Sequence, residues 1–238
     1  MDKLFTTLLD VIYPPKCLTC GRLGTILCSV CIKSAPFNFH PRCVICNTFC
    51  QNGFTHVGCL TFFTPEKLLS PFLYEGVIKK LIVSSKFGQM SFYNLELLTK
   101  IALDLTACSF LKNAVTQDAL IVPVPSSKDR LHARGFNPAD VIAKALSEHK
   151  FCPFLVRKKK TLYQSELSKA ARFANVGGAF EVPSAFLAKL KGQDVILVDD
   201  LCTSGATFIE CAKVLKAAGA RFVMCFSLAR ASDFIYNK

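Results

Sequence analysis

The chain has 238 residues, of which 51% are hydrophobic, and it carries a formal net charge of +12. This length suits one medium domain plus a small one, or a single larger α/β domain, and the apolar fraction excludes global disorder. No apolar run is long enough to span a membrane, so we expect no membrane span. The basic excess is concentrated in residues 126–191, which contain 13 basic and 5 acidic residues. Nucleic acid, phosphorylated metabolites or both are therefore candidate partners, although a solvated basic surface would need no partner.

The first 15 residues are apolar but contain Asp2 and Asp10 and lack a small-residue cleavage site. They predict a short helix, not a signal peptide, and hence a cytoplasmic protein.

Eight of the 13 cysteines lie in the first 59 residues. In a reducing compartment such a cluster is more often a metal site than a disulfide framework. Two sets share one spacing, and each offers four ligands for tetrahedral, structural zinc. In the second set a histidine takes one position, where an ordinary surface histidine is the alternative, and Cys50 lies off the pattern and could compete. The predicted ligands are Cys17, Cys20, Cys28 and Cys31, then Cys43, Cys46, His56 and Cys59.

A composition shift near residue 65 separates this zinc-binding module, residues 1–65, from a second domain, residues 66–238. In the second domain, strand patterns alternate with helical ones, which favours an α/β fold with a mainly parallel sheet and crossover helices. The expected strands cover 69–76, 119–125, 154–157, 179–182, 195–198 and 221–229. The expected helices cover 77–88, 92–112, 136–149 and 205–218.

The stretch "DVILVDDLCTSGAT" begins at residue 194 and places two acids directly after a buried strand. In open α/β sheets, ligands bind beyond the carboxyl ends of the strands. The amides of residues 204–207 open the next helix and attract an anion, and Gly205 allows close approach. Asp199 and Asp200 can accept hydrogen bonds from a sugar diol, directly or through Mg²⁺. A ribose 5-phosphate fits both features, with its phosphate at the amides and its hydroxyls at the acids. An ordinary helix cap would explain one of the two acids but not the pair.

This stretch resembles the signature with which type I phosphoribosyltransferases bind 5-phosphoribosyl 1-pyrophosphate (PRPP). Together with the cysteine pairs, "PVPSSKDRLHARGFNPAD" (123–140) and "QSELSKAARFANVGGAF" (164–180), it resembles the ComF family, which includes the GntX-type proteins. The resemblance covers nearly the whole chain, with the motifs in family order. Cys202 and Ser204 are signature variants, Pro138 stands where Gln is common, and His56 replaces a cysteine.

The resemblance implies a type I phosphoribosyltransferase-like sheet flanked by helices, and a role for each motif. Asp199 and Asp200 would be the catalytic acids that hold the ribose hydroxyls near Mg²⁺. The 5-phosphate would be bound by Thr203, Ser204, Gly205, Ala206 and Thr207. The pyrophosphate would be bound by Ser126, Ser127, Lys128 and Arg130, with Arg134 as a second anion contact. A hood loop would contain Gln164, Arg172 and Asn175.

Two basic features are less specific. Lys86 is a further candidate for the site, or a solvated lysine at a helix end. A basic run could follow a nucleic-acid backbone or form a solvated turn. Its members are Arg157, Lys158, Lys159 and Lys160.

Three functions are compatible with these patterns. The first is a Mg²⁺-dependent, PRPP-using phosphoribosyltransferase of natural transformation with an unidentified acceptor. The second is a non-catalytic, PRPP-responsive protein that binds single-stranded DNA alongside protein partners of the DNA-uptake machinery. The third is a zinc-ribbon adaptor with an exposed apolar patch and no response to PRPP, and the complete PRPP signature argues against it.

Overall fold

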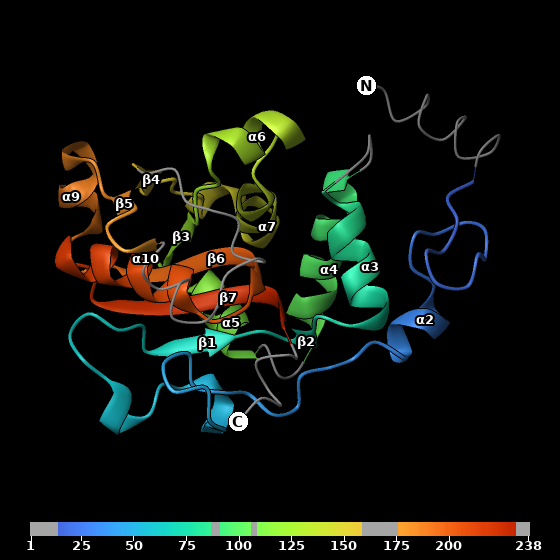
Figure 1. Cartoon of the computed structure of the whole chain (residues 1–238), viewed down its shortest axis with the longest axis horizontal. Coiled ribbons are helices and arrows are strands. Elements are labelled where there is room, and N and C mark those ends of the chain that lie inside the picture. Colours follow the sequence, from blue (N-terminus) through green and yellow to red (C-terminus); the bar gives the residue numbers. More distant parts are fainter. Residues whose placement is uncertain (1–13, 87–90, 106–108, 159–175, 232–238) are drawn as a thin grey trace.

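The computed structural model describes residues 14–86, 91–105, 109–158 and 176–231. Figure 1 shows a central sheet with helices on both faces, and the N-terminal segment running below and beside it. The helix expected in the first 15 residues lies almost entirely outside the described part. The same holds for the hood-loop candidates Gln164, Arg172 and Asn175, and for Lys159 and Lys160.

The central sheet is parallel throughout, as the alternating pattern predicted. Its strands follow the order β1-β7-β6-β3, and β2 pairs with the end of β7. β7 is buried along almost its entire length, which explains its continuous apolar sequence. The strands are β1 (Lys67–Leu69), β2 (Phe72–Leu73), β3 (Leu120–Pro123), β6 (Asp194–Cys202) and β7 (Phe222–Arg230).

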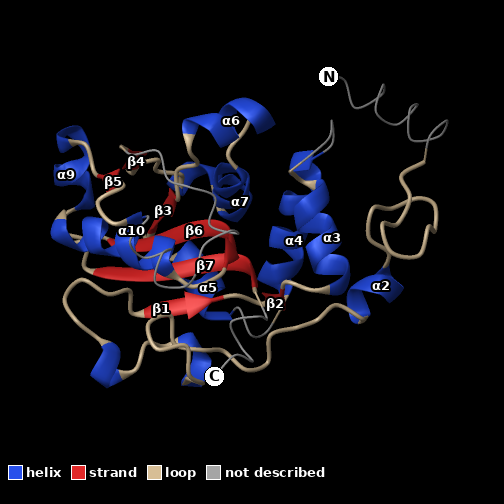
Figure 2. Cartoon of the chain, viewed as in Figure 1, coloured by secondary structure: helices blue, strands red, loops and turns tan. Residues whose placement is uncertain are grey.

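Helices cover both faces of this sheet (Figure 2). Successive side chains of a strand point to opposite faces. Ile196 and Val198 of β6 therefore join one apolar core, while Val195 and Leu197 join the other. The first core is closed by α3 (Gly76–Ser84), α4 (Ser91–Asp104), α5 (Ser109–Thr116) and α7 (Pro138–Leu146). The second is closed by α9 (Ser184–Leu190), α10 (Ala206–Ala217) and the antiparallel pair β4 (Val156–Arg157) and β5 (Phe180–Glu181).

Several elements differ from the sequence-based expectation, including α9, a helix that was not expected. The strand expected at 69–76 is two short strands, and the helix expected at 92–112 is two helices, α4 and α5. The apolar periodicity resumes after the interruption, so the pattern does not mark it. The strand expected at 195–198 continues to Cys202, because its pairing with β7 extends through both acids. The segment after β3 contains a short helix, α6 (Lys128–Arg134), where a loop was expected.

The N-terminal segment contains little regular structure. It has α2 (Ser29–Lys33) and two short 3-10 helices, η1 (Gln51–Gly53) and η2 (Val57–Cys59), and a third, η4 (Glu148–Lys150), follows α7. Isolated bridges join Phe37 to Phe72 and Phe54 to Lys67, which attaches the segment to the β1–β2 edge. The division at residue 65 stays a prediction.

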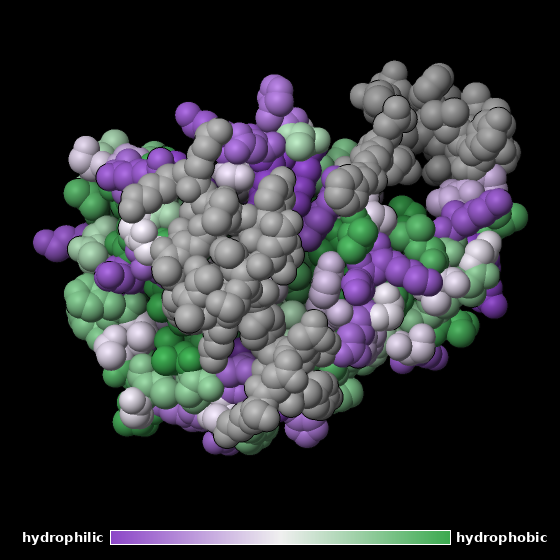
Figure 3. Space-filling model, viewed as in Figure 1, coloured by the Kyte–Doolittle hydropathy of each residue, from purple (hydrophilic) through white to green (hydrophobic). Residues whose placement is uncertain are grey.

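Apolar surface gathers at the lower left of the molecule in Figure 3, where residues 57–63 run. Val57 is 89% exposed and Phe62 is 70% exposed. Among the described residues, no helix is both long and apolar enough to cross a membrane.

Candidate functional site

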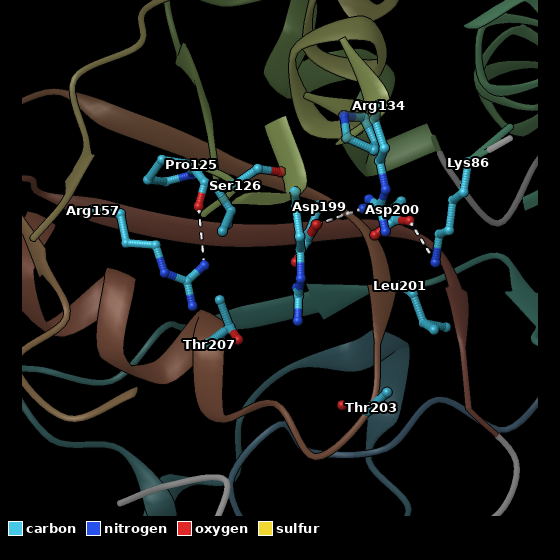
Figure 4. A pocket seen from close by; sticks show the side chains of 13 residues that line it. Lys86, Pro125, Ser126, Arg134, Arg157, Asp199, Asp200, Leu201, Thr203 and Thr207 are labelled. Carbon is cyan, nitrogen blue, oxygen red and sulfur yellow. Dashed lines mark hydrogen bonds and ion pairs between the residues drawn. The ribbon is translucent and has the colours of Figure 1, made fainter. Parts of the chain in front are cut away.

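A cavity of about 240 Å³ lies at the carboxyl ends of β3 and β6 (Figure 4). It brings together two acids, four cations and three hydroxyl groups from segments far apart in the sequence. The lining residues are Lys86, Val124, Pro125, Ser126, Arg130, Arg134, Pro138, Arg157, Asp199, Asp200, Leu201, Thr203 and Thr207. This is the position that the topology of open α/β sheets predicts for a ligand.

The two acids of β6 are joined by a hydrogen bond, and one of them forms an ion pair with Lys86. The backbone N–H of Asp200 donates to Asp199 Oδ1 at 2.9 Å, and Lys86 Nζ lies 3.3 Å from Asp200 Oδ2. Burial, and then the charge of Asp200, raise the pKa of Asp199 to about 8. Burial also acts upward on Asp200, but Lys86 and the hydrogen bond with Asp199 outweigh it and lower the pKa of Asp200. The pair therefore holds one proton at neutral pH, and a cation or ligand that engages both carboxylates would displace it to solvent.

The turn from β6 into α10, which we call the phosphate loop (residues 203–207), has the geometry of an anion cradle. Gly205 has φ +81°, a left-handed conformation that favours glycine, and α10 begins at the next residue. The amino-terminal end of this twelve-residue helix, where its dipole is positive, adjoins the cavity through Thr207. Thr203 and Thr207 line the cavity, whereas Ser204 is buried and its Oγ accepts a hydrogen bond from the N–H of Ala206.

On the opposite wall, the segment between β3 and α6 is held by a hydrogen-bond network. Ser126 Oγ donates to Asn137 Oδ1 at 2.7 Å, and Ser127 caps α6 by accepting a hydrogen bond from the N–H of Arg130. Arg130 and Arg134 line the cavity from α6, and Arg134 points toward Asp200 (Figure 4). The structure thus places Ser126, Arg130 and Arg134 around the cavity. Ser127 has a capping role, and Lys128 is not among the lining residues.

Arg157 has a different environment from Lys158, the other member of its basic run that the structure describes. Its guanidinium lines the cavity, and Nη1 donates to the carbonyl of Pro125 at 3.3 Å (Figure 4). Burial lowers its pKa. The next residue, Lys158, is exposed and pairs with Glu181. Sequence reasoning missed both Arg157 and the supporting Asn137 as parts of this site, because nothing local distinguishes them from neighbouring polar residues.

Both predicted cysteine sets are assembled, and each has its four ligand atoms within 4.8 Å of one another. A zinc ion bound by thiolates at about 2.3 Å would place neighbouring sulfurs about 3.8 Å apart. In the first cluster, the Sγ atoms of Cys20 and Cys28 are 3.7 Å apart, which fits this geometry. Backbone hydrogen bonds, with that of Cys20 the strongest, lower the pKa of Cys17 to about 6 and favour the thiolate that a metal needs.

The second cluster has a histidine oriented for metal binding. Nδ1 of His56 lies 3.3 Å from Cys46 Sγ, and Nε2 lies 2.9 Å from the carbonyl of Phe49, to which its N–H donates. This second hydrogen bond fixes the tautomer and leaves Nδ1 for the metal. Cys50 is buried outside the cluster, and burial raises its pKa to about 11, so it remains a thiol. Both clusters could therefore hold zinc as structural sites.

Comparison with known proteins agrees with this architecture. Residues 131–233 match the model of the phosphoribosyl transferase domain. The parallel sheet, the cavity and the domain match together define a protein with a phosphoribosyltransferase domain. Two cysteine clusters that could hold zinc precede this domain.

Similar proteins narrow the class further. The chain is 28% identical to DNA utilization protein YhgH of Escherichia coli K12 over 90% of its own length and 93% of that relative. It is 29% identical to Competence protein F of Haemophilus influenzae, over 86% and 90% of the two chains. It is 26% identical to Competence protein ComFC of Streptococcus pneumoniae, over 89% and 84%. Together with the domain match, these similarities support the resemblance to the ComF family.

Proposed function

We propose that this chain binds PRPP with Mg²⁺ in the cavity between β3, β6 and α10, and that it acts as a phosphoribosyltransferase in natural transformation. The observation that carries the proposal is that two adjacent carboxylates and an anion cradle open into one cavity with several cations. The names of the relatives, which refer to competence and DNA utilization, support a role in DNA uptake. The acceptor is unidentified, and we expect the protein to act in the cytoplasm.

Each wall of the cavity suits one part of PRPP. The phosphate loop would hold the 5-phosphate, and Asp199 and Asp200 would hold the ribose hydroxyls. Arg130 and Arg134 would face the pyrophosphate, on which negative charge builds as its bond to the ribose breaks. Bound Mg²⁺ would share in neutralising that charge. Because Asp199 retains a proton until about pH 8, full engagement of both carboxylates would release a proton.

The test measures PRPP binding and pyrophosphate release in the presence of Mg²⁺. Release is assayed against a panel of single-stranded DNA, RNA and free nucleobases. The double variant Asp199→Asn/Asp200→Asn is compared with Asp118→Asn, which removes an exposed acid outside the cavity. We expect the double variant to lose PRPP binding with unchanged zinc content, and the Asp118 variant to match the wild type. Equal PRPP affinity in the double variant would refute the proposal.

The second candidate is a non-catalytic, PRPP-responsive protein that binds single-stranded DNA. It is supported by α6, which has no buried residue and carries Lys128, Arg130 and Arg134, of which the two arginines line the cavity. PRPP binding without turnover on any panel member would favour this candidate. Its DNA affinity should then fall steeply with salt, because phosphate contacts release counterions.

The exposed apolar residues at 57–63 are a candidate surface for protein partners.

A further inference from the structure

We propose that the turn between the first two ligands of the second cluster, which we call the knuckle (residues 43–46), positions the phosphate loop. Metal at this cluster and phosphate at the loop would then bind cooperatively. The ligand half of this inference rests on the proposed function, whereas the contact between knuckle and loop does not.

The knuckle touches the phosphate loop at its tightest point. A Cβ atom added to Gly205 would lie 2.9 Å from the carbonyl oxygen of Val44 and 3.0 Å from its Cγ2. Val44 is only 1% exposed and shares an apolar core with Ala206 and Phe208, the residues that begin α10. The left-handed turn that opens the cradle therefore packs directly against the backbone of the knuckle. A displacement of Val44 would be transmitted to Gly205, because packed interiors leave little room for relaxation.

The last residue of β7 fastens the knuckle to the sheet. The guanidinium of Arg230, a residue that is 2% exposed, donates from Nη1 to the carbonyl of Arg42 and from Nη2 to Asn47 Oδ1, both at 2.8 Å. These acceptors flank the knuckle on its two sides. Arg230 is also in register with Cys202, the last residue of β6 before the phosphate loop. Knuckle and loop thus share one anchor at the carboxyl edge of the sheet.

Only the second cluster has this contact with the phosphate loop among the described residues. Cys17, Cys28 and Cys31 of the first cluster pack in the other apolar core, with α3 and α4. In Figure 1 the α2 segment and α10 lie at opposite sides of the molecule. Metal at the second cluster alone would fix the conformation of Val44, because ligands lie on both sides of it in sequence. By linkage, PRPP must then strengthen metal binding by the same factor as metal strengthens PRPP binding, and such couplings are typically about 5–150-fold.

The first experiment compares PRPP affinity in two matched variants. Cys46→Ser and Cys20→Ser each remove the exposed second cysteine of a C-x2-C pair. We expect Cys46→Ser to weaken PRPP binding by about tenfold or more, and Cys20→Ser to leave it within about twofold of the wild type. Equal effects of the two substitutions would overturn the inference.

A second set of three variants leaves every metal ligand in place. Val44→Ala should weaken PRPP binding about fivefold or more, Val44→Ile should restore most of it, and the exposed Val57→Ala should have no effect. In Co²⁺-loaded protein, the two clusters are distinguished by their absorption bands, because only one has a histidine ligand. PRPP should slow the release of Co²⁺ to a chelator from the second cluster only, and Val44→Ala should abolish that protection. A purely structural role of Val44 would not produce protection that depends on the ligand, so its absence in the wild type would overturn the inference.

A final comparison separates this inference from the proposed function. If the wild type does not bind PRPP, the proposed function fails, and the contact is then judged from metal release alone. Gly205→Ala pushes a Cβ into Val44, whereas Gly192→Ala carries the same backbone strain, with φ +75°, in open space. We expect faster Co²⁺ release from the second cluster in the Gly205 variant only. Equal release rates in the two variants would refute the contact.

Discussion

Replacing Asp199 with asparagine should stabilise the protein while removing its ligand binding. Burial, and then the charge of Asp200, raise the pKa of the Asp199 carboxyl from its ordinary value of 3.8 to about 8. Between these values the folded state retains a proton that the unfolded state has lost. The wild type therefore loses stability as the pH rises from about 4 to about 8, at up to about 1.4 kcal/mol per unit. Asparagine has no proton to lose and escapes this penalty.

The difference between these two pKa values sets an upper limit of about 6 kcal/mol on the stability lost by pH 8. Asp199 keeps some contact with the open cavity, so we expect a gain of about 2 kcal/mol, or about 4–8 °C in Tm for a chain of this size. The assay is thermal unfolding of zinc-loaded protein without Mg²⁺ at pH 5 and pH 8, with Asp118→Asn as control. The advantage of Asp199→Asn should be small at pH 5 and larger at pH 8. An advantage that is absent, or that shrinks as the pH rises, would refute the assigned protonation of the pair.

Two further substitutions test the supports of the fold and the site. A Cβ on Gly53, where φ is +78°, would lie 2.1 Å from the carbonyl oxygen of Leu68, so Gly53→Ala should cost at least about 2 kcal/mol in denaturant unfolding. Gly58→Ala, in open space, should cost little, and equal costs would contradict the assigned contact. Asn137→Ala should weaken PRPP or pyrophosphate binding by about tenfold, because Ser126 Oγ loses its hydrogen-bond acceptor. Leaving a buried polar group without a partner costs about 1–3 kcal/mol. Unchanged affinity with unchanged stability would show that this network does not orient the loop.

The sequence predicted the parts of the site whose chemistry is local. The strand, the two acids, Gly205 and the following helix occupy consecutive positions, and the ligand spacing of each cysteine pair fits within one turn. These features depend on short-range geometry, and the structure reproduces them.

The remaining parts depend on contacts between distant segments. Lys86, for which the sequence left a site role and a solvated role open, reaches Asp200 from just beyond α3. Arg157, which the sequence did not place at this site, reaches the cavity from β4. Arg230 holds the carbonyl of Arg42 across 188 positions of sequence. No local pattern distinguishes these three cations from solvated ones, and single-sequence periodicity carries no information about which segments meet.

The unequal placement of the two cysteine clusters suggests why the chain has both. Each small cluster would need metal to hold its shape, because so short a segment buries little apolar surface by itself. The first cluster supports the scaffold, since its cysteines pack with the helices of one core. The second lies against the loop that would hold phosphate, so a metal bound there would restrain the left-handed turn at Gly205. Removal of metal should therefore have two separable effects: loss of overall stability through the first cluster, and loss of ligand affinity through the second.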